Sequence, residues 1–274
     1  MIAAYLDESG IHDSAEVCVI AGYFGGRGQW RKFEVAWRKV LLRFAVPLNK
    51  FHAKDLMNRC GFFHDWNARK REQFSRDLAD SIAAFKIHPV GQALILDDFN
   101  LFTTQQKRWF TGAVLHDGKL VTSGCPGKPY FMPFQYCVKQ VAGYAPVGGR
   151  AHFFFGLDRP FAEYATILMR DLKENAPVYH SWFHQIGDVA FPFAKDTPQL
   201  QAADFLVHMI YKDMLRRKAE NNFGIGLPPP ILGKCLCNVR GGVKDIVYHD
   251  KHTLQNLLQQ TYADYGYWDK TELA

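Results

Sequence analysis

The chain has 274 residues, 48% of them hydrophobic and 15% aromatic, with a formal net charge of +6. This composition excludes a disordered chain and predicts a sizeable core, and no Ser-, Gly- or Pro-rich linker separates two cores. We therefore expect one domain over residues 1–218, with a C-terminal extension, residues 219–274, packed on it.

The sequence gives no sign of a membrane span or a secretory signal. It has no apolar stretch approaching about 18 residues, and its N-terminus lacks the pattern of a signal peptide. We expect a cytoplasmic location. The six cysteines are scattered and suggest free thiols rather than a disulfide framework.

Basic residues gather in three segments, residues 27–43, 69–76 and 212–218, with Trp30 and Trp37 inside the first. Basic segments with aromatic neighbours suit a polyanionic partner such as nucleic acid. The same pattern is typical of the solvated faces of amphipathic helices. Charge alone agrees with a nucleic-acid partner without establishing one.

Hydrophobic periodicity and turn residues predict alternating strands and helices. In chain order these are a strand at 2–6, a strand at 15–24, a helix at 29–44, a loop with 51–56, a helix at 67–85, a strand at 87–97, an exposed excursion at 112–129, a helix at 131–144, a strand at 151–157, a helix at 161–175, a strand at 184–193, a helix at 197–218 and an aromatic helix at 254–267.

Acidic residues end two of these strands. Asp7 and Glu8 follow the first strand, and Asp158 follows the fourth, where a proline two residues later prevents continuation. Open α/β sheets bind ligands at such strand ends. Because strand neighbours point to opposite faces, Asp7 and Glu8 cannot both face one site unless the strand has begun to turn, and we favour Asp7. Asp97 and Asp98, at another strand end, are rivals to Asp158.

The helix predicted over 197–218 carries a polar line beside its apolar stripe. Thr197-Pro198 is a good helix start, and Gln201, Asp204 and His208 follow at helical spacing. A half-buried carboxylate on a helix that covers a sheet needs a partner. The alternative is an acid favoured only by the helix dipole.

These motifs together resemble a bacterial and phage family catalogued as domain of unknown function 3800. The resemblance spans roughly residues 1 to 215. It rests on Tyr5-Leu6-Asp7-Glu8-Ser9-Gly10, Phe51-His52-Ala53-Lys54-Asp55-Leu56, the strand ending in Asp158, and Gln201-Ala202-Ala203-Asp204. The family is considered distantly similar to the ribonuclease H-like fold of nucleases, resolvases and transposases.

The resemblance implies an α/β fold with a ribonuclease H-like mixed five-stranded sheet flanked by helices. Three strands would form an antiparallel meander, a fourth would lie parallel to the first, and a late helix would cross the sheet. In ribonuclease H-like enzymes the metal-binding acids come from the first strand, the fourth strand and that helix, which match Asp7, Asp158 and Asp204. The implied activity is that of a divalent-metal-dependent nuclease or related phosphoryl-transfer enzyme acting on RNA or DNA.

The chemistry explains the need for several carboxylates. Two Mg²⁺ or Mn²⁺ ions roughly 3.5–4 Å apart can neutralise a scissile phosphate, activate water and stabilise the leaving oxygen. Such ions take oxygen ligands. Asp7 would bridge them, Asp158 and Asp204 would flank them, and Glu8 would be a ligand or a hydrogen-bond acceptor behind one.

Five further residues are candidates around this site. Gln201 would hold a water, a phosphate oxygen or the Asp204 carboxylate. His52 and His208 could transfer a proton or contact phosphate, since histidine titrates near neutral pH. Lys54 and Arg159 could contact phosphate. Each of the five has a structural role as its alternative.

Other classes of function are less well supported. Cys235, Cys237, His249 and His252 lack the usual spacing of a zinc finger. The sequence lacks the glycine motifs of P-loop proteins and Rossmann dehydrogenases, and the nucleophile elbow of α/β-hydrolases. The main alternative is a non-catalytic nucleic-acid or protein-binding module of a phage or defence system, with structural acids.

Overall fold

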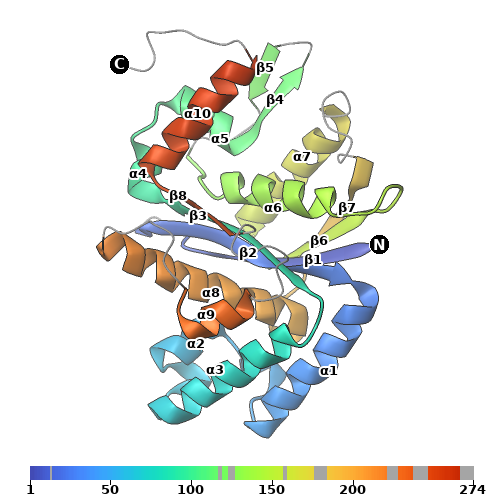
Figure 1. The fold of residues 1–274 in the computed structure, drawn as a ribbon, viewed down its shortest axis with the longest axis vertical. Coiled ribbons are helices and arrows are strands. Elements are labelled where there is room, and N and C mark those ends of the chain that lie inside the picture. Colours follow the sequence, from blue (N-terminus) through green and yellow to red (C-terminus); the bar gives the residue numbers. More distant parts are fainter. Residues whose placement is uncertain are drawn as a thin grey trace.

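The computed structural model describes residues 1–12, 14–116, 119–122, 127–156, 159–175, 184–220, 228–236 and 246–265. Its centre is a six-stranded sheet in the order β7-β6-β1-β2-β3-β8 (Figure 1). The strands are β1 (Ile2–Ser9), β2 (Val17–Gly26), β3 (His88–Ile95), β6 (Ala151–Phe155), β7 (Ile186–Ala190) and β8 (Ile246–His249).

The strand pairing confirms the predicted meander and the parallel fourth strand. β1 pairs antiparallel with β2, and β2 antiparallel with β3. β6 lies parallel to β1, β7 parallel to β6, and β8 parallel to β3. The carboxyl ends of β1, β6 and β7 therefore meet at one end of the sheet, where ligands bind in open α/β folds.

The predicted number of five strands is wrong by one. All five expected strands are present, and β8 adds a sixth beside β3. β8 has only four residues, too few to show the alternation that identifies a strand in a sequence. The segment expected to be an exposed excursion contains a further pair of short antiparallel strands, β4 (Ala113–His116) and β5 (Lys119–Thr122).

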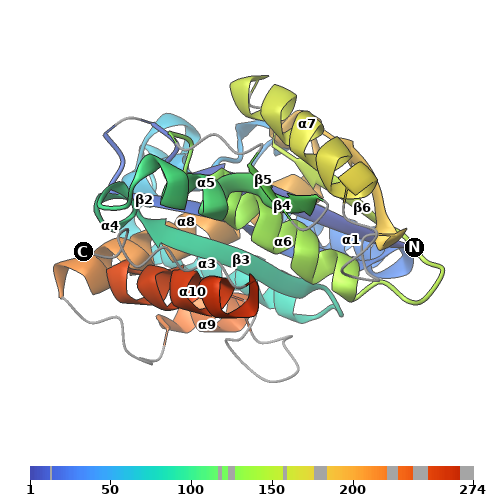
Figure 2. The same ribbon diagram turned by 90° about the horizontal axis from the view of Figure 1, so that it is seen from above.

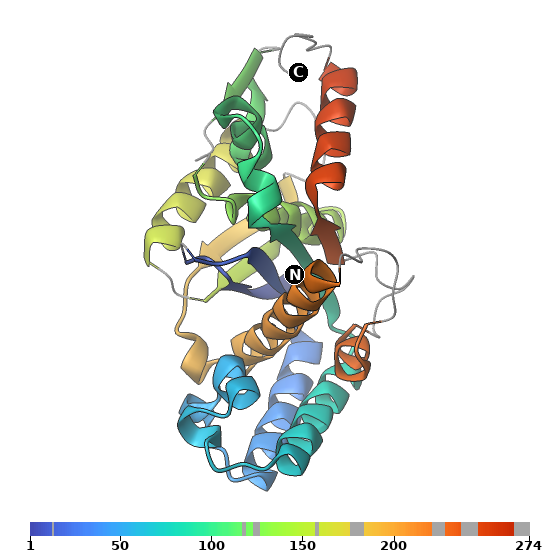
Figure 3. The same cartoon turned by 90° about the vertical axis from the view of Figure 1, so that its left-hand side faces the viewer.

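Helices cover both faces of the sheet (Figures 1 and 3). One face carries α1 (Arg27–Arg43), α2 (Ala53–Asn58), α3 (Ala68–Ala83), α8 (Pro198–Ala219) and α9 (Pro230–Cys235). The other carries α6 (Phe131–Gly143) and α7 (Arg159–Asn175). No helix among the described residues is long and apolar enough to cross a membrane.

A third group of helices extends the second face. It comprises α4 (Leu96–Asn100), α5 (Thr104–Gly112) and α10 (Lys251–Tyr265), which Figure 2 shows on the same side of the sheet as α6 and α7. Leu94 of β3, Phe99, Phe110 and Leu254 form a small apolar cluster that joins these helices to the sheet. The C-terminal helix is thereby attached to the main body.

The alternation of β1 decides where its terminal acids point. Ala4 and Leu6 enter the core beneath α6 and α7, whereas Ala3 and Tyr5 pack on the core beneath α1 and α8. Because successive side chains alternate, Asp7 continues the α8 face and Glu8 the α6 face. The predicted strand end at Leu6 is wrong, because β1 continues to Ser9 and both acids lie within it, with Asp7 on the α8 face.

Helix α8 crosses the sheet where it was expected. It begins at Pro198 after the N-cap residue Thr197, as predicted. The helix is buried on more sides than one apolar stripe requires, because the sheet lies on one side and α1, α2 and α9 on others. The neighbouring elements therefore hold the polar side chains of α8 in defined positions, as a binding or catalytic site requires.

Candidate active site

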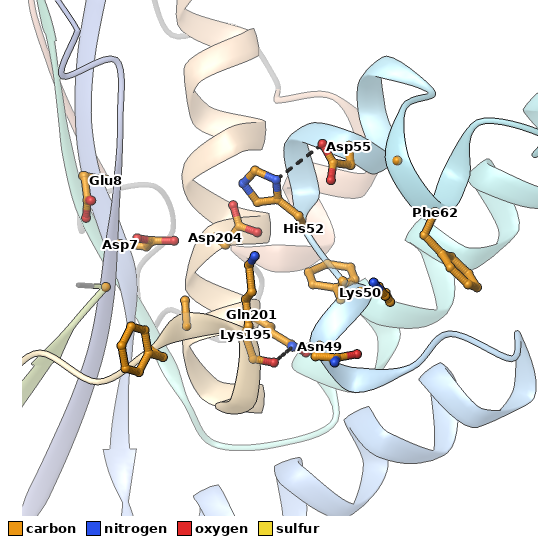
Figure 4. A pocket seen from close by; sticks show the side chains of 15 residues that line it. Asp7, Glu8, Asn49, Lys50, His52, Asp55, Phe62, Lys195, Gln201 and Asp204 are labelled. Atoms are coloured by element: carbon orange, nitrogen blue, oxygen red, sulfur yellow. Dashed lines mark hydrogen bonds and ion pairs between the residues drawn. The ribbon is translucent and has the colours of Figure 1, made fainter. Parts of the chain in front are cut away.

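A cavity of about 880 Å³ opens at the carboxyl end of β1, between the sheet, α8 and α2 (Figure 4). Five predicted site residues line it: Asp7, Glu8, His52, Gln201 and Asp204. Residues far apart in the sequence therefore meet at one place. Ten further residues complete the lining, and the sequence reasoning gave no site role to the polar and exposed aromatic ones among them: Asn49, Lys50, Asp55, Phe62, Phe193 and Lys195.

Asp7 lies against the end of β6. Gly156, which follows that strand, donates its N–H to the carbonyl of Leu6 at 3.2 Å. A Cβ atom at position 156 would stand only 2.4 Å from Asp7 Oδ1. Only glycine, which has no side chain, therefore fits beside the Asp7 carboxylate at this position. Figure 4 shows Asp7 directed towards Asp204 on α8.

Asp204 lies in the second turn of α8 and is tied to the start of α2. Its Oδ2 accepts a hydrogen bond from the backbone N–H of Ala53 at 2.8 Å. This bond fixes the carboxylate and also places the preceding residue, His52, at the cavity. The family-like motif around His52 and the Gln-x-x-Asp motif of α8 are thus joined by a direct contact.

Burial disfavours the charged form of both carboxylates. Burial, then the charges of Glu8 and Asp204, raise the pKa of Asp7 well above its ordinary value. Burial also raises the pKa of Asp204 to about 6, against the lowering effects of His52 and the Ala53 N–H. Neither acid forms an ion pair with a described residue. Half-buried negative charge without a counter-ion favours binding of a cation.

Glu8 contributes from the other face of the strand. Its charge raises the pKa of Asp7 and that of the buried thiol of Cys18, which belongs to the core beneath α6. It nevertheless lines the cavity, as does Gly156 at the end of the neighbouring strand. Glu8 therefore adds negative charge behind Asp7 rather than facing α8 directly.

Gln201 holds three segments of the cavity wall together. Its Oε1 accepts a hydrogen bond from Trp37 Nε1 at 2.9 Å, and its Nε2 donates to the carbonyls of Leu48 at 2.7 Å and Lys195 at 2.9 Å. These bonds connect α8 to α1 and to the short 3₁₀ helices η1 (Leu48–Lys50) and η4 (Ala194–Asp196). With both amide protons in use, Gln201 positions the wall.

Gln201→Ala is expected to lower the free energy of unfolding by about 2–4 kcal/mol, because it leaves a buried indole N–H and two carbonyls without their partner. Urea denaturation measures the change. The control is Gln199→Ala, since Gln199 makes one long bond of 3.5 Å to Glu34, and we expect less than about 1 kcal/mol there. Equal losses in the two variants would contradict the positioning role.

His52 is the histidine that reaches the cavity. Its side chain is 51% exposed, and its Nδ1 lies 3.5 Å from Asp55 Oδ1. His208 and Lys54 are not in the cavity lining. Burial lowers the pKa of His208 to about 4, helped by the charges of Lys212, His52 and Lys54. His208 is therefore neutral at physiological pH.

Two predicted residues at the fourth strand cannot be compared with the site in full. Asp158 lies outside the described residues, and Arg159 begins α7 with a side chain outside the description. The rivals of Asp158 lie elsewhere: Asp97 pairs with Lys218 at 2.7 Å, and Asp98 accepts a hydrogen bond from the Lys251 N–H. Neither rival lines the cavity.

The described residues contain no group of three or more His, Cys, Asp or Glu side chains placed to hold a metal ion. The zinc alternative gains no support, because Cys235 is buried in the core and His249 bonds with Gln92 at 2.6 Å. Cys237 lies outside the described part. Asp7 and Asp204 are the two described members of the predicted carboxylate set.

The basic segments do not line the cavity, and six of their fourteen basic residues form ion pairs with described residues. Arg43 pairs with Asp77, Arg217 with Asp213, and Lys218 with both Glu16 and Asp97. By contrast, Lys50 and Lys195 of the cavity form no ion pair with any described residue. The positive charge available to a polyanion at this site thus comes from two lysines outside the predicted clusters.

No protein-family model and no curated protein matches the chain. Among solved structures, the chain is similar to the crystal structure of Bst-RNase HIII in complex with Mn²⁺, with a TM-score of 0.37 and 14% sequence identity. The similarity covers 93% of this chain and 65% of the other, so this chain spans about two thirds of that protein's length. A likeness this low decides neither fold family nor activity.

Proposed function

We propose that the chain is a divalent-metal-dependent nuclease or related phosphoryl-transfer enzyme on a ribonuclease H-like sheet, with Asp7, Asp158 and Asp204 as metal ligands. The observation that carries the proposal is the pair Asp7 and Asp204, which face one cavity from a strand and a crossing helix and form no ion pair with a described residue. The resemblance in sequence motifs, which includes the same two acids, agrees with the proposal.

The donor set fits Mg²⁺ or Mn²⁺. Carboxylate oxygens are the ligands of hard divalent cations; the Ala53 N–H holds the Asp204 carboxylate, and Asp7 lies against Gly156, where a side chain would not fit. When bound, such ions would neutralise a scissile phosphate and lower the pKa of a bound water below that of bulk water. Glu8 adds negative charge that favours cation binding.

The other cavity residues have roles around that centre. His52, half exposed beside Asp55, can hold a proton for the leaving group. Gln201 holds the segments of the cavity wall in place through its three hydrogen bonds. Lys50 and Lys195 take the phosphate contacts that were predicted for Lys54 and His208, because they line the cavity. Arg159 remains a predicted phosphate contact.

The proposal predicts specific binding of Mn²⁺, measured by titration calorimetry and by electron paramagnetic resonance of the free ion. We expect Asp7→Asn and Asp204→Asn each to weaken binding at least tenfold, because each removes a charged ligand. Asp65→Asn is the charge-matched control, since Asp65 is 96% exposed and away from the cavity. Cleavage of labelled RNA, DNA and hybrid duplexes should follow Mn²⁺ binding across the variants.

Failure of Mn²⁺ to bind, or equal binding by wild type and both cavity variants, would contradict the proposal. Nucleic-acid binding that needs no divalent cation and survives both substitutions would favour the alternative, a non-catalytic binding module with structural acids.

A further inference from the structure

We propose that the cavity takes a single-stranded nucleic-acid segment, with unpaired bases stacked on Phe62 and Phe193 and phosphates beside Lys50 and Lys195. The inference rests on the proposed function and names its substrate class.

Exposure of phenylalanine is concentrated at this cavity. Among the phenylalanine side chains that the structure describes, only Phe62 and Phe193 are exposed, at 39% and 71%, and both line the cavity. Burial of such a ring in the core would stabilise the fold. Two rings left in water at one cavity therefore indicate a ligand with flat apolar surfaces.

The two rings come from different walls. Phe62 belongs to the 3₁₀ helix η2 (Gly61–Phe63), which follows α2, whereas Phe193 lies between β7 and η4. Figure 4 shows Phe62 across the cavity from Asp7. Bases on the two rings would therefore contact two walls of the cavity that Asp7 and Asp204 also line.

Phe62 is a preorganised platform. Its ring stands edge-on to Phe63 at 5.6 Å and to Trp66 at 6.3 Å, so an aromatic cluster supports it from behind. Phe193 has no ring contact with a described residue and can adapt to the base that it meets. Stacking of this kind is tolerant of sequence because every base has a π-face.

The charges of the cavity suit a nucleic-acid backbone. Its acids, Asp7, Glu8, Asp55 and Asp204, would repel a phosphate that arrived without a cation. Lys50 and Lys195, which have no ion pair with a described residue, lie between Phe62 and Asp7 in the view of Figure 4. Phosphates beside the carboxylates can therefore contact the two lysines. The phosphate at the carboxylates can contact the acids through a bound metal ion.

Stacking on protein rings selects against paired strands. In a duplex each base already stacks on its neighbours, and only unpaired bases can turn towards an aromatic side chain. A continuous duplex would leave Phe62 and Phe193 without partners. Single strands of RNA and of DNA both have unpaired bases that can stack on the two rings and phosphates that can contact the two lysines.

The test is a binding titration by fluorescence anisotropy with a labelled single-stranded DNA, the matching RNA, and the duplex of the same sequence. It is run in EDTA and again with Ca²⁺. We expect single strands to bind more tightly than the duplex. Phe62→Ala and Phe193→Ala should each raise the Kd about tenfold, the usual scale for losing one stacked base. Phe62→Tyr and Phe193→Trp should bind as wild type does.

Leu42→Ala is the control, because Leu42 is 80% exposed on α1 and outside the cavity lining. It should leave the Kd unchanged. Duplex binding as tight as single-strand binding, or unchanged Kd values in both alanine variants, would overturn the inference. A preference for either DNA or RNA agrees with it.

The two proposals can fail separately. If Asp7→Asn loses Mn²⁺ while both alanine variants bind single strands normally, only the stacking inference falls. If wild type binds no Mn²⁺ while both alanine variants lose affinity for single strands, the metal-dependent function falls and the stacking site stands.

Discussion

Asp204→Asn is expected to stabilise the metal-free protein by about 1–3 kcal/mol at neutral pH and to abolish metal-dependent cleavage. Burial raises the pKa of Asp204 to about 6 from an ordinary value of 3.8, so its charged form is disfavoured in the folded state. Asparagine removes that charge and can still accept the bond from the Ala53 N–H. It cannot supply an anionic ligand.

The stability gain should depend on pH in a defined direction. A carboxyl whose pKa is raised on folding contributes its stability below the unfolded pKa and loses it as pH rises through the folded value. Wild type should therefore match Asp204→Asn near pH 4 and fall below it as pH rises through about 6. Chemical denaturation of both proteins at several pH values, without divalent metal, measures the difference.

Asp65→Asn again serves as the control, with no expected change in stability or cleavage, because its carboxylate is in water. A destabilised Asp204→Asn would show that the carboxylate has a structural partner and would contradict the account of the site. Unchanged cleavage would contradict its role as a metal ligand.

Gly156→Ala is expected to lower the rate of cleavage about a hundredfold, the scale of a catalytic group displaced by roughly 1 Å. The new methyl group would stand 2.4 Å from Asp7 Oδ1, so the carboxylate or the end of β6 must move. Overpacking of this kind also destabilises folds by about 1–3 kcal/mol. Affinity for Mn²⁺ should fall together with activity.

Gly28→Ala is the matched control for this substitution. A Cβ atom there meets no atom within 4 Å, and the residue lies in the first turn of α1, where alanine favours the helix. We expect full activity and an unchanged or slightly higher Tm. If Gly156→Ala retained wild-type cleavage and Mn²⁺ affinity, Asp7 would not need its observed position.

The sequence was sufficient to predict the elements that carry the acids. Asp7 ends an apolar run that reads as a strand, and Asp204 follows a helix start marked by Thr197-Pro198, so local patterns locate both. Their meeting at one cavity depended on topology, which the motif resemblance supplied. The contact between Asp204 and Ala53 joins residues 151 positions apart and has no local signal.

The residues that form the cavity walls could not be predicted from the sequence, for a physical reason. Phe62 and Phe193 look like core residues in a sequence, because phenylalanine is usually buried and nothing local distinguishes an exposed ring. Lys50 and Lys195 stand outside the basic clusters, and only the fold shows that the clusters lie away from the cavity lining. Gln201 was placed correctly on α8, whereas its three bonds to separate segments required the structure.

The parallel strand β8 has a consequence for how this protein emerges from the ribosome. Until residues 246–249 are made, β3 presents a free edge of N–H and C=O groups, and Gln92 lacks His249 beside it. Open edges are templates for pairing with other chains. Synthesis proceeds from the N-terminus. The edge of β3 therefore stays unpaired while about half of the chain, the part between β3 and β8, is being translated.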